Sequence, residues 1–160
     1  MLIEEKIVKL LIKNKKTLAI AESCSGGLLS HRLTNIPGSS KFFKCGLVVY
    51  SNESKSKLLK ISPLLLAKHG AVSAEVAQQM AQNIRKFFRT DIGIAITGIA
   101  GPGGAQPGKP VGLTFIAINS LNKKLKAEDN RCLQCLFRGK RLQIKNQAAT
   151  TALKLFLKFL

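Results

Sequence analysis

Tryptophan is absent from this sequence of 160 residues, tyrosine occurs once, histidine twice, and acidic residues number only 8. The scarcity of Trp and Tyr leaves few rings for stacking bases, although 8 Phe are present. No apolar run reaches the roughly 18–20 residues that a bilayer span needs. The N-terminal segment carries charge throughout and lacks a cleavage site of small residues, which argues against a signal peptide. We therefore expect a cytoplasmic protein with no membrane partner.

The charge balance is strongly basic, with 26 Lys and Arg against 8 Asp and Glu and a net charge of +18. Such a surface attracts anions of several kinds, including nucleic acids, membranes and phosphorylated metabolites. The basic residues are spread along the whole chain and form no tail, which favours a merely solvated basic surface. We expect nucleic acid to bind only non-specifically.

The four cysteines do not form a recognisable metal site. Cys132 and Cys135 make a single CxxC, without a second pair or a nearby histidine that would complete four zinc ligands. Their segment has the pattern of a half-buried strand, whereas a thioredoxin-type motif opens a helix. We expect reduced thiols, no disulfide framework, no metal and no cofactor.

Short apolar runs alternate with amphipathic stretches along the chain. The apolar runs predict strands at residues 17–21, 43–50, 92–97, 111–119 and 131–137. The amphipathic stretches predict helices at residues 3–13, 28–36, 51–61, 74–88 and 140–159. This order predicts one domain over residues 1–160, an α/β sandwich on a mainly parallel sheet. A hairpin between the last two strands would make that sheet mixed.

The loop after the first predicted strand, residues 21–27, reads AESCSGG. Two serines and two glycines lie there at the start of a helix: Ser23, Ser25, Gly26 and Gly27. Free backbone N–H groups at such a position favour an anion. The segment therefore has three interpretations: it provides a nucleophilic serine with its own oxyanion hole, it binds a phosphate, or it is simply a helix cap with a tight turn. It lacks the G-x-S-x-G pattern of hydrolases and the lysine of a P-loop.

A serine nucleophile needs a base, and the loop VVYSNESK at residues 48–55 offers Lys55, with Tyr50 nearby. A lysine can accept a proton where burial or a neighbouring cation lowers its pKa. The structural alternative is one more solvated lysine. His31 and His69 lack the sequence context of a catalytic triad.

A third loop, TGIAGPGG at residues 97–104, follows another buried strand. Thr97 ends the strand, and Gly98 and Gly101 offer backbone donors to a phosphate or carbonyl oxygen. The alternative is a long surface loop without a ligand. Because ligands collect at the carboxyl ends of strands in open α/β sheets, we expect these loops to meet at one edge.

These motifs resemble the CinA carboxy-terminal domain family, which includes bacterial nicotinamide-nucleotide amidases. The resemblance rests on motifs in the same order along the chain, namely AESCSGG, LTNIPGSS, GLVVYSNESK, GAVS, TGIAGPGG and KPVGLTF. It continues more loosely through FRGKR and NQA, so that nearly the whole chain is covered. It implies a three-layer α/β/α sandwich on a mixed sheet, in the stand-alone form of the domain.

The resemblance also implies an activity, the hydrolysis of nicotinamide mononucleotide to nicotinic acid mononucleotide and ammonia in NAD recycling. By motif, Ser23 is the nucleophile, Lys55 the general base, and Tyr50 assists proton transfer or orients the lysine. Thr97 and Arg141 help to bind or position a small phosphorylated nucleotide. The family acts without a metal, and its members are commonly homodimers or larger, so we expect a homo-oligomer.

The sequence departs from the family pattern near its C-terminal helix. Gly139 is followed by Lys140 where the family commonly has an acid, and Lys145 stands where an Arg is frequent. Lysine keeps the charge but loses bidentate recognition of phosphate. Two alternatives stay open: a non-catalytic, competence-associated or nucleic-acid-binding protein, and an amidase for a related amide.

Overall fold

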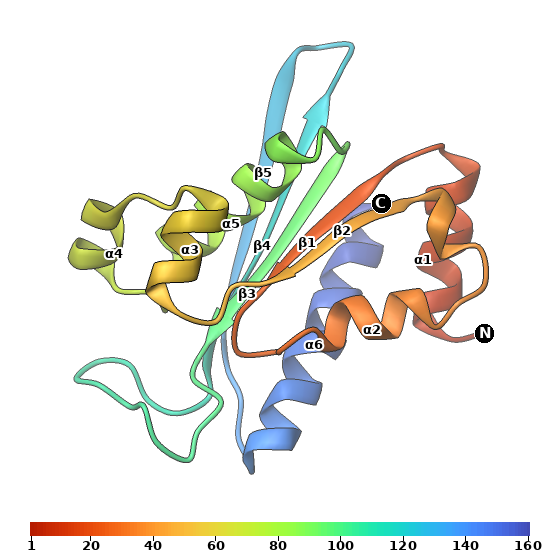
Figure 1. Ribbon diagram of the computed structural model, residues 1–160. Coiled ribbons are helices and arrows are strands. Elements are labelled where there is room, and N and C mark those ends of the chain that lie inside the picture. Colours follow the sequence, from red (N-terminus) through yellow and green to blue (C-terminus); the bar gives the residue numbers. More distant parts are fainter.

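A five-stranded sheet in the order β2-β1-β3-β4-β5 forms the middle layer of the computed structural model, which describes residues 1–160 (Figure 1). The strands are β1 (Leu18–Glu22), β2 (Phe43–Val48), β3 (Ile92–Gly98), β4 (Leu113–Asn122) and β5 (Ala127–Leu136). β1 pairs in parallel with β2 and β3, whereas β4 is antiparallel to both β3 and β5. Four strands thus point one way and β4 the other, which confirms the mixed, mainly parallel sheet.

Helices cover both faces of the sheet and complete the three layers (Figure 1). One face carries α1 (Ile3–Lys13), α2 (Leu28–Thr34) and α6 (Arg141–Phe159). The other face carries α3 (Asn52–Leu59), α4 (Pro63–His69) and α5 (Ala74–Phe87). A short 3₁₀ turn, η1 (Ser39–Lys41), leads into β2. None of these helices is long and apolar enough to cross a membrane.

The two covered faces explain why residues 18–21 of β1 are an unbroken apolar run. Leu18 and Ile20 point into the core under α1, α2 and α6. Ala19 and Ala21 point into the core on the α5 side, where small residues let the helix approach. Since side chains alternate along a strand, the next residue in the second series is Ser23. The serine therefore leaves the sheet on the face that carries α3.

The structure differs from the sequence prediction at helix α4 and at the start of β5. Helix α4 was not predicted, although Ser62 accepts a hydrogen bond from the N–H of Leu65 and Pro63 follows it at the first helical position. This pair is a recognisable helix start. β5 begins at Ala127, four residues before the predicted 131. Its first residues are polar because they lie in an exposed part of the β4–β5 hairpin, so they give no apolar alternation.

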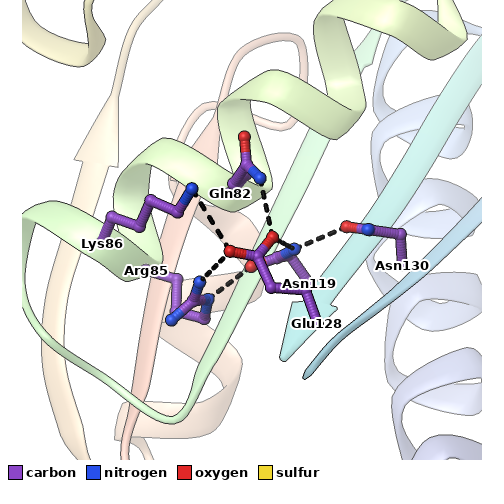
Figure 2. A network of polar contacts seen from close by, with 6 residues as sticks. All are labelled: Gln82, Arg85, Lys86, Asn119, Glu128 and Asn130. Atoms are coloured by element: carbon purple, nitrogen blue, oxygen red, sulfur yellow. Dashed lines mark hydrogen bonds and ion pairs between the residues drawn. The ribbon is translucent and has the colours of Figure 1, made fainter. Parts of the chain in front are cut away.

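A polar network fastens this hairpin to α5 (Figure 2). The guanidinium of Arg85, buried under the helix, donates to the Asn119 side chain and to Glu128, 2.9 Å away. The Glu128 carboxylate also receives the amides of Gln82 at 2.7 Å and Asn119 at 3.1 Å. Hydrogen bonds from Gln82, Asn119 and Lys86 hold the pKa of Glu128 at about 2. The network replaces apolar packing where the hairpin rises beyond the sheet.

Candidate active site

Ser23 lies directly after β1, at the carboxyl edge of the sheet. Its N–H donates to the Ile96 carbonyl at 3.0 Å, which continues the ladder between β1 and β3. The backbone of the serine is therefore held by the sheet and not by a free loop. Its side chain is nearly covered, with the residue 7% exposed.

Lys55 projects from the first turn of α3 onto this serine. The Nζ of Lys55 donates to the Oγ of Ser23 at 3.0 Å and to the Val49 carbonyl at 3.0 Å. A third, longer contact reaches the Tyr50 carbonyl at 3.3 Å. Two carbonyl acceptors can orient a neutral amine so that its lone pair faces the serine hydroxyl. This geometry puts Lys55 within hydrogen-bond reach of the Ser23 hydroxyl.

The environment of Lys55 favours the neutral amine. The residue is only 1% exposed, and no carboxylate forms an ion pair with it. Burial therefore lowers the pKa of Lys55 from its ordinary 10.5, because desolvation disfavours the charged form. The neighbouring Cys24 thiol opposes this shift.

The cap of α3 explains how the lysine reaches the serine. The Ser51 hydroxyl oxygen accepts the N–H of Ser54 at 3.0 Å, and the Ser54 hydroxyl oxygen accepts the N–H of Ser51 in return. This capping box starts the helix immediately after β2. Helical side chains lean toward the helix N-terminus, so Lys55 points back to the strand ends.

The loop between Ser23 and α2 holds fewer free donors than the sequence implied. The Gly26 N–H, which we expected among the oxyanion donors, donates to the Ser23 carbonyl at 3.0 Å. The N–H of Leu28 donates to the Ser25 carbonyl at 3.2 Å. The N–H groups of Cys24, Ser25 and Gly27 have no acceptor within the chain. They are the donors of this loop that remain for a ligand.

Glu22, which sequence reasoning did not single out, takes the first free amides of α2. Its fully buried carboxylate accepts the N–H of Leu29 at 3.1 Å and of Ser30 at 2.8 Å, and the Ser30 hydroxyl at 2.7 Å. The start of α2 is therefore capped by the protein itself and is not an open anion site. The available signal was an acid one residue before the candidate nucleophile and eight residues before a helical serine, Ser30.

Tyr50 and Arg141 meet at the mouth of the site. The Arg141 guanidinium donates to the Tyr50 hydroxyl at 2.6 Å and to the Gly101 carbonyl at 2.7 Å. Tyr50 reaches Lys55 through its carbonyl oxygen, whereas its phenol turns to Arg141. Lys55, Tyr50 and Arg141 therefore lie close together. Arg141 bridges the loop after β2 and the Gly/Pro loop at residues 97–104.

Thr97 and Gly98 make structural contacts at the carboxyl end of β3. The buried Thr97 hydroxyl donates to the Ala71 carbonyl at 2.8 Å and ties β3 to the segment before α5. A Cβ on Gly98 would lie 2.7 Å from the Thr114 hydroxyl and 3.1 Å from the Cys24 sulfur. Glycine there lets the loop that follows Ser23 pack against the end of β3.

The remaining candidates stand apart from the serine. Cys132 packs against the core on the α5 side and Cys135 against the opposite core, so the two thiols lie on different faces of the sheet. They cannot ligate one ion, as expected for a chance CxxC. His31 is an exposed residue of α2, and His69 lies 3.5 Å from Glu75.

A pocket of about 390 Å³ opens beside the Ser23 loop, between α2 and α6. Residues 25–28 and His31 form one wall, and Lys145 is the cation on the other. Gly26 and Gly27 have positive φ angles of 61° and 94°, and a Cβ on Gly26 would lie 3.3 Å from the Lys145 Nζ. The predicted loop glycines thus keep the pocket open.

Fold and site together define a three-layer α/β domain with a buried Ser–Lys pair at the carboxyl edge of its sheet. The comparisons with known proteins agree. The family model described as the CinA C-terminal domain matches residues 2–160, and the chain belongs to this family.

Curated relatives are similar over most of the chain. One from Moorella thermoacetica is 53% identical over 140 residues, which covers 87% of the chain and 32% of the relative. One from Thermoanaerobacter pseudethanolicus is 43% identical over 157 residues, covering 98% and 37%. Their names refer to competence damage and state no reaction. The chain spans about a third of the length of these relatives.

Solved structures match the whole fold. A CinA superfamily protein from Klebsiella pneumoniae 700603 is 30% identical with a TM-score of 0.90, covering 98% of the chain and 94% of that protein. Another from Escherichia coli is 31% identical with a TM-score of 0.90, covering 99% and 91%. The α/β/α sandwich expected from the resemblance is therefore shown.

Proposed function

We propose that this chain is an amidohydrolase that converts nicotinamide mononucleotide to nicotinic acid mononucleotide and ammonia. The observation that carries the proposal is the 3.0 Å hydrogen bond between the Ser23 Oγ and the Lys55 Nζ, both buried. A base with a lowered pKa beside a hydroxyl is the arrangement of an activated serine nucleophile. The substrate comes from the family resemblance, since its amidase members act on this nucleotide.

The first half of the reaction acylates the serine. The neutral Lys55 amine takes the Ser23 proton while Oγ attacks the carboxamide carbon, and the carbonyl oxygen becomes an oxyanion. The tetrahedral intermediate collapses when the Lys55 ammonium returns its proton to the amide nitrogen, which leaves as ammonia. The product is an ester between Ser23 and the nicotinoyl group.

The second half hydrolyses this ester. Lys55, neutral again, accepts a proton from water, whose oxygen attacks the ester carbonyl. The carbon–Oγ bond then breaks and the lysine returns the proton to Ser23, which releases the carboxylic acid. The same base therefore serves both halves, and no metal ion enters the scheme.

Backbone donors would stabilise the oxyanion. The N–H groups of Cys24, Ser25 and Gly27 are unengaged and lie within the loop that follows the nucleophile. One such donor typically contributes about 10²–10³ in rate. Because the loop is held by sheet bonds and by Glu22, the donors are fixed before the substrate arrives.

Ammonia release from nicotinamide mononucleotide, without added metal, tests the proposal. We expect Ser23→Ala and Lys55→Met to lose at least about 10³-fold in kcat. Lys57→Ala is the matched control, because Lys57 is exposed on the same helix and pairs only with Glu53. An inactive wild-type protein, or a variant without Ser23 that keeps full activity, would refute the assignment.

The basic surface supports a second candidate, a non-catalytic protein that binds nucleic acid. The net charge of +18 is the observation in its favour. This candidate requires tight, salt-sensitive binding to DNA that survives Ser23→Ala. The amidase requires only weak binding to DNA. An amidase for a related amide is distinguished by comparing ammonia release from nicotinamide, its riboside and its mononucleotide.

A further inference from the structure

The end of the sheet at which β1 and β3 begin lies opposite the Ser–Lys pair and is strongly basic. Residues 13–16 lead into β1, residues 86–89 lead into β3, and residues 122–126 join β4 to β5. These three segments contain eight basic residues and no acidic one. We call them the amino-end surface. The fold therefore gathers at one end some of the basic residues that are scattered along the sequence.

The three segments are neighbours in space. β3 starts beside the first residue of β1 and beside the last part of β4. Just behind the segments, the Asp91 carboxylate accepts the Thr17 N–H at 2.9 Å and pairs with Lys123, also at 2.9 Å. The basic side chains of the three segments therefore share one continuous surface.

Most of the positive charge of the amino-end surface is not neutralised within the chain. Two of its lysines pair with carboxylates, Lys86 with Glu128 at 3.2 Å and Lys123 with Asp91. Six basic residues have no carboxylate within ion-pair distance, namely Lys13, Lys15, Lys16, Arg89, Lys124 and Lys126. A surface of this charge attracts an anionic partner.

Apolar side chains protrude from the same end of the molecule. Leu125 stands at the tip of the β4–β5 hairpin between Lys124 and Lys126 and is 74% exposed. Phe87 and Phe88, at the end of α5, are 48% and 43% exposed. The hairpin rises beyond the neighbouring turns, so that its tip is the most prominent part of this end (Figure 1). Apolar side chains set among cations are typical of a surface that enters a lipid interface.

The shape and chemistry of this end fit a bilayer better than a nucleic acid. A single strand stacks its bases on aromatic rings along a basic groove, whereas the foremost side chain here is aliphatic and stands on a protrusion. The hollow of about 440 Å³ beside the hairpin is lined by Asp91 and Asp129 as well as by lysines. It therefore offers no uniformly positive track to a phosphate backbone.

We propose that the amino-end surface docks on a membrane that contains anionic lipids. Leu125 enters the interface, and the surrounding lysines contact the lipid phosphates. Ser23 and Lys55, at the opposite end of the sheet, remain open to solution. The sequence predicted no membrane partner because it lacks a spanning segment, which a contact of this kind does not need. The proposal is independent of the amidase reaction.

Co-sedimentation with lipid vesicles tests the charge of the surface. The wild-type protein should bind vesicles of equimolar phosphatidylglycerol and phosphatidylcholine, and not vesicles of phosphatidylcholine alone. The double variant Lys124→Ala/Lys126→Ala should bind about 10–30-fold more weakly, since each lysine near an anionic surface contributes about fivefold. Lys57→Ala/Lys68→Ala is the matched control, because it removes the same charge from exposed positions of α3 and α4. Equal weakening in both double variants, or no binding of the wild-type protein, would overturn the proposal.

A fluorescent probe tests the insertion of the hairpin tip. The chain contains no Trp, so Leu125→Trp places a single indole at the tip. Its emission should move to shorter wavelength when the anionic vesicles are added. Leu64→Trp, at a position 82% exposed on α4, should show no such change. An unchanged emission of Leu125→Trp would overturn the insertion.

A single-stranded oligonucleotide provides the test against the other anionic partner. We expect it to bind the wild-type protein and Lys124→Ala/Lys126→Ala alike. Oligonucleotide binding that depends on these two lysines, in a protein that does not bind the anionic vesicles, would overturn the proposal and assign the surface to nucleic acid.

Discussion

The Lys55 side-chain nitrogen and the Ser23 hydroxyl oxygen lie 3.0 Å apart, although 32 positions separate the two residues in sequence. Adjacent parallel strands produce this contact. β1 delivers the serine and β2 leads into the helix that carries the lysine, so both arrive at one edge of the sheet. In the proposed reaction, this contact gives the serine a lysine base whose pKa burial has lowered.

The activity should depend on the ionisation of Lys55. Because burial lowers the pKa of this lysine, kcat/KM should rise with pH through a group that titrates below 10.5. Lys55→Arg should be inactive at every pH, since arginine keeps its proton. The pH–rate profile of the wild-type protein is the measurement. A profile that rises only at the ordinary lysine value would contradict the assignment.

The same ionisation should affect folding. Between the lowered pKa of the folded state and the ordinary 10.5, the unfolded chain holds a proton on Lys55 that the folded protein lacks. The free energy of unfolding should therefore rise with pH in this window, relative to Lys55→Met. Urea unfolding of both proteins at several pH values tests it, and parallel curves would show that the lysine stays protonated.

Tyr50 and Arg141 should act as a unit. The Arg141 guanidinium donates to the Tyr50 hydroxyl and to the Gly101 carbonyl, so either removal releases the bridge over the site. We expect Tyr50→Phe and Arg141→Ala each to reduce kcat/KM, and the double variant to be non-additive by about 0.5–1 kcal/mol. Additive losses would mean that the two side chains work independently. Tyr50→Phe keeps the carbonyl that contacts Lys55.

Glu22 should matter for the stability of the loop. Its buried carboxylate accepts three hydrogen bonds from Leu29 and Ser30, and an amide in its place offers one acceptor atom instead of two. Glu22→Gln should therefore lower the free energy of unfolding by about 1–3 kcal/mol. Ser30→Ala, which removes only one of these donors, is the milder comparison. An unchanged urea midpoint in Glu22→Gln would refute the capping role.

The network around Glu128 should make the hairpin acid-sensitive. With its pKa lowered to about 2 from 4.5, the carboxylate contributes stability that is present above pH 4.5 and lost as the pH falls through about 2. Its side chain is 26% exposed, so water offsets part of the loss. Glu128→Gln should cost about 1 kcal/mol at pH 7. The difference from wild type should vanish near pH 2, and a constant difference would contradict the linkage.

Periodicity predicted the layers because both faces of the sheet are covered. Residues 18–21 are apolar at every position since each side chain enters a core, and this run predicted the strand and the loop after it. The hydrophilic start of β5 and the short helix α4 were not predicted, because few of their side chains enter a core. They are held by Glu128 and by a Ser–Pro cap, which leave little hydrophobic pattern.

The site was less predictable than the fold. Lys55 looks like any other of the 26 basic residues, and only burial by α3 distinguishes it. The direction of the Tyr50 phenol depends on Arg141, 91 positions away, which local sequence cannot reveal. The turn after Ser23 consumes the Gly26 N–H, which the loop sequence does not reveal. Long-range packing thus decided the first two of these features, and a local turn decided the third.

The Ser–Lys pair is encoded within a short N-terminal stretch, whereas Lys145 and Arg141 belong to the last helix. In the proposed amidase, the reacting serine and lysine therefore belong to a different part of the chain from these two basic residues. Mutations along α6 can alter which molecule is accepted without disturbing the reacting atoms. Relatives that keep the first stretch and vary the last helix would then share the proposed reaction and differ in the substrate that they accept.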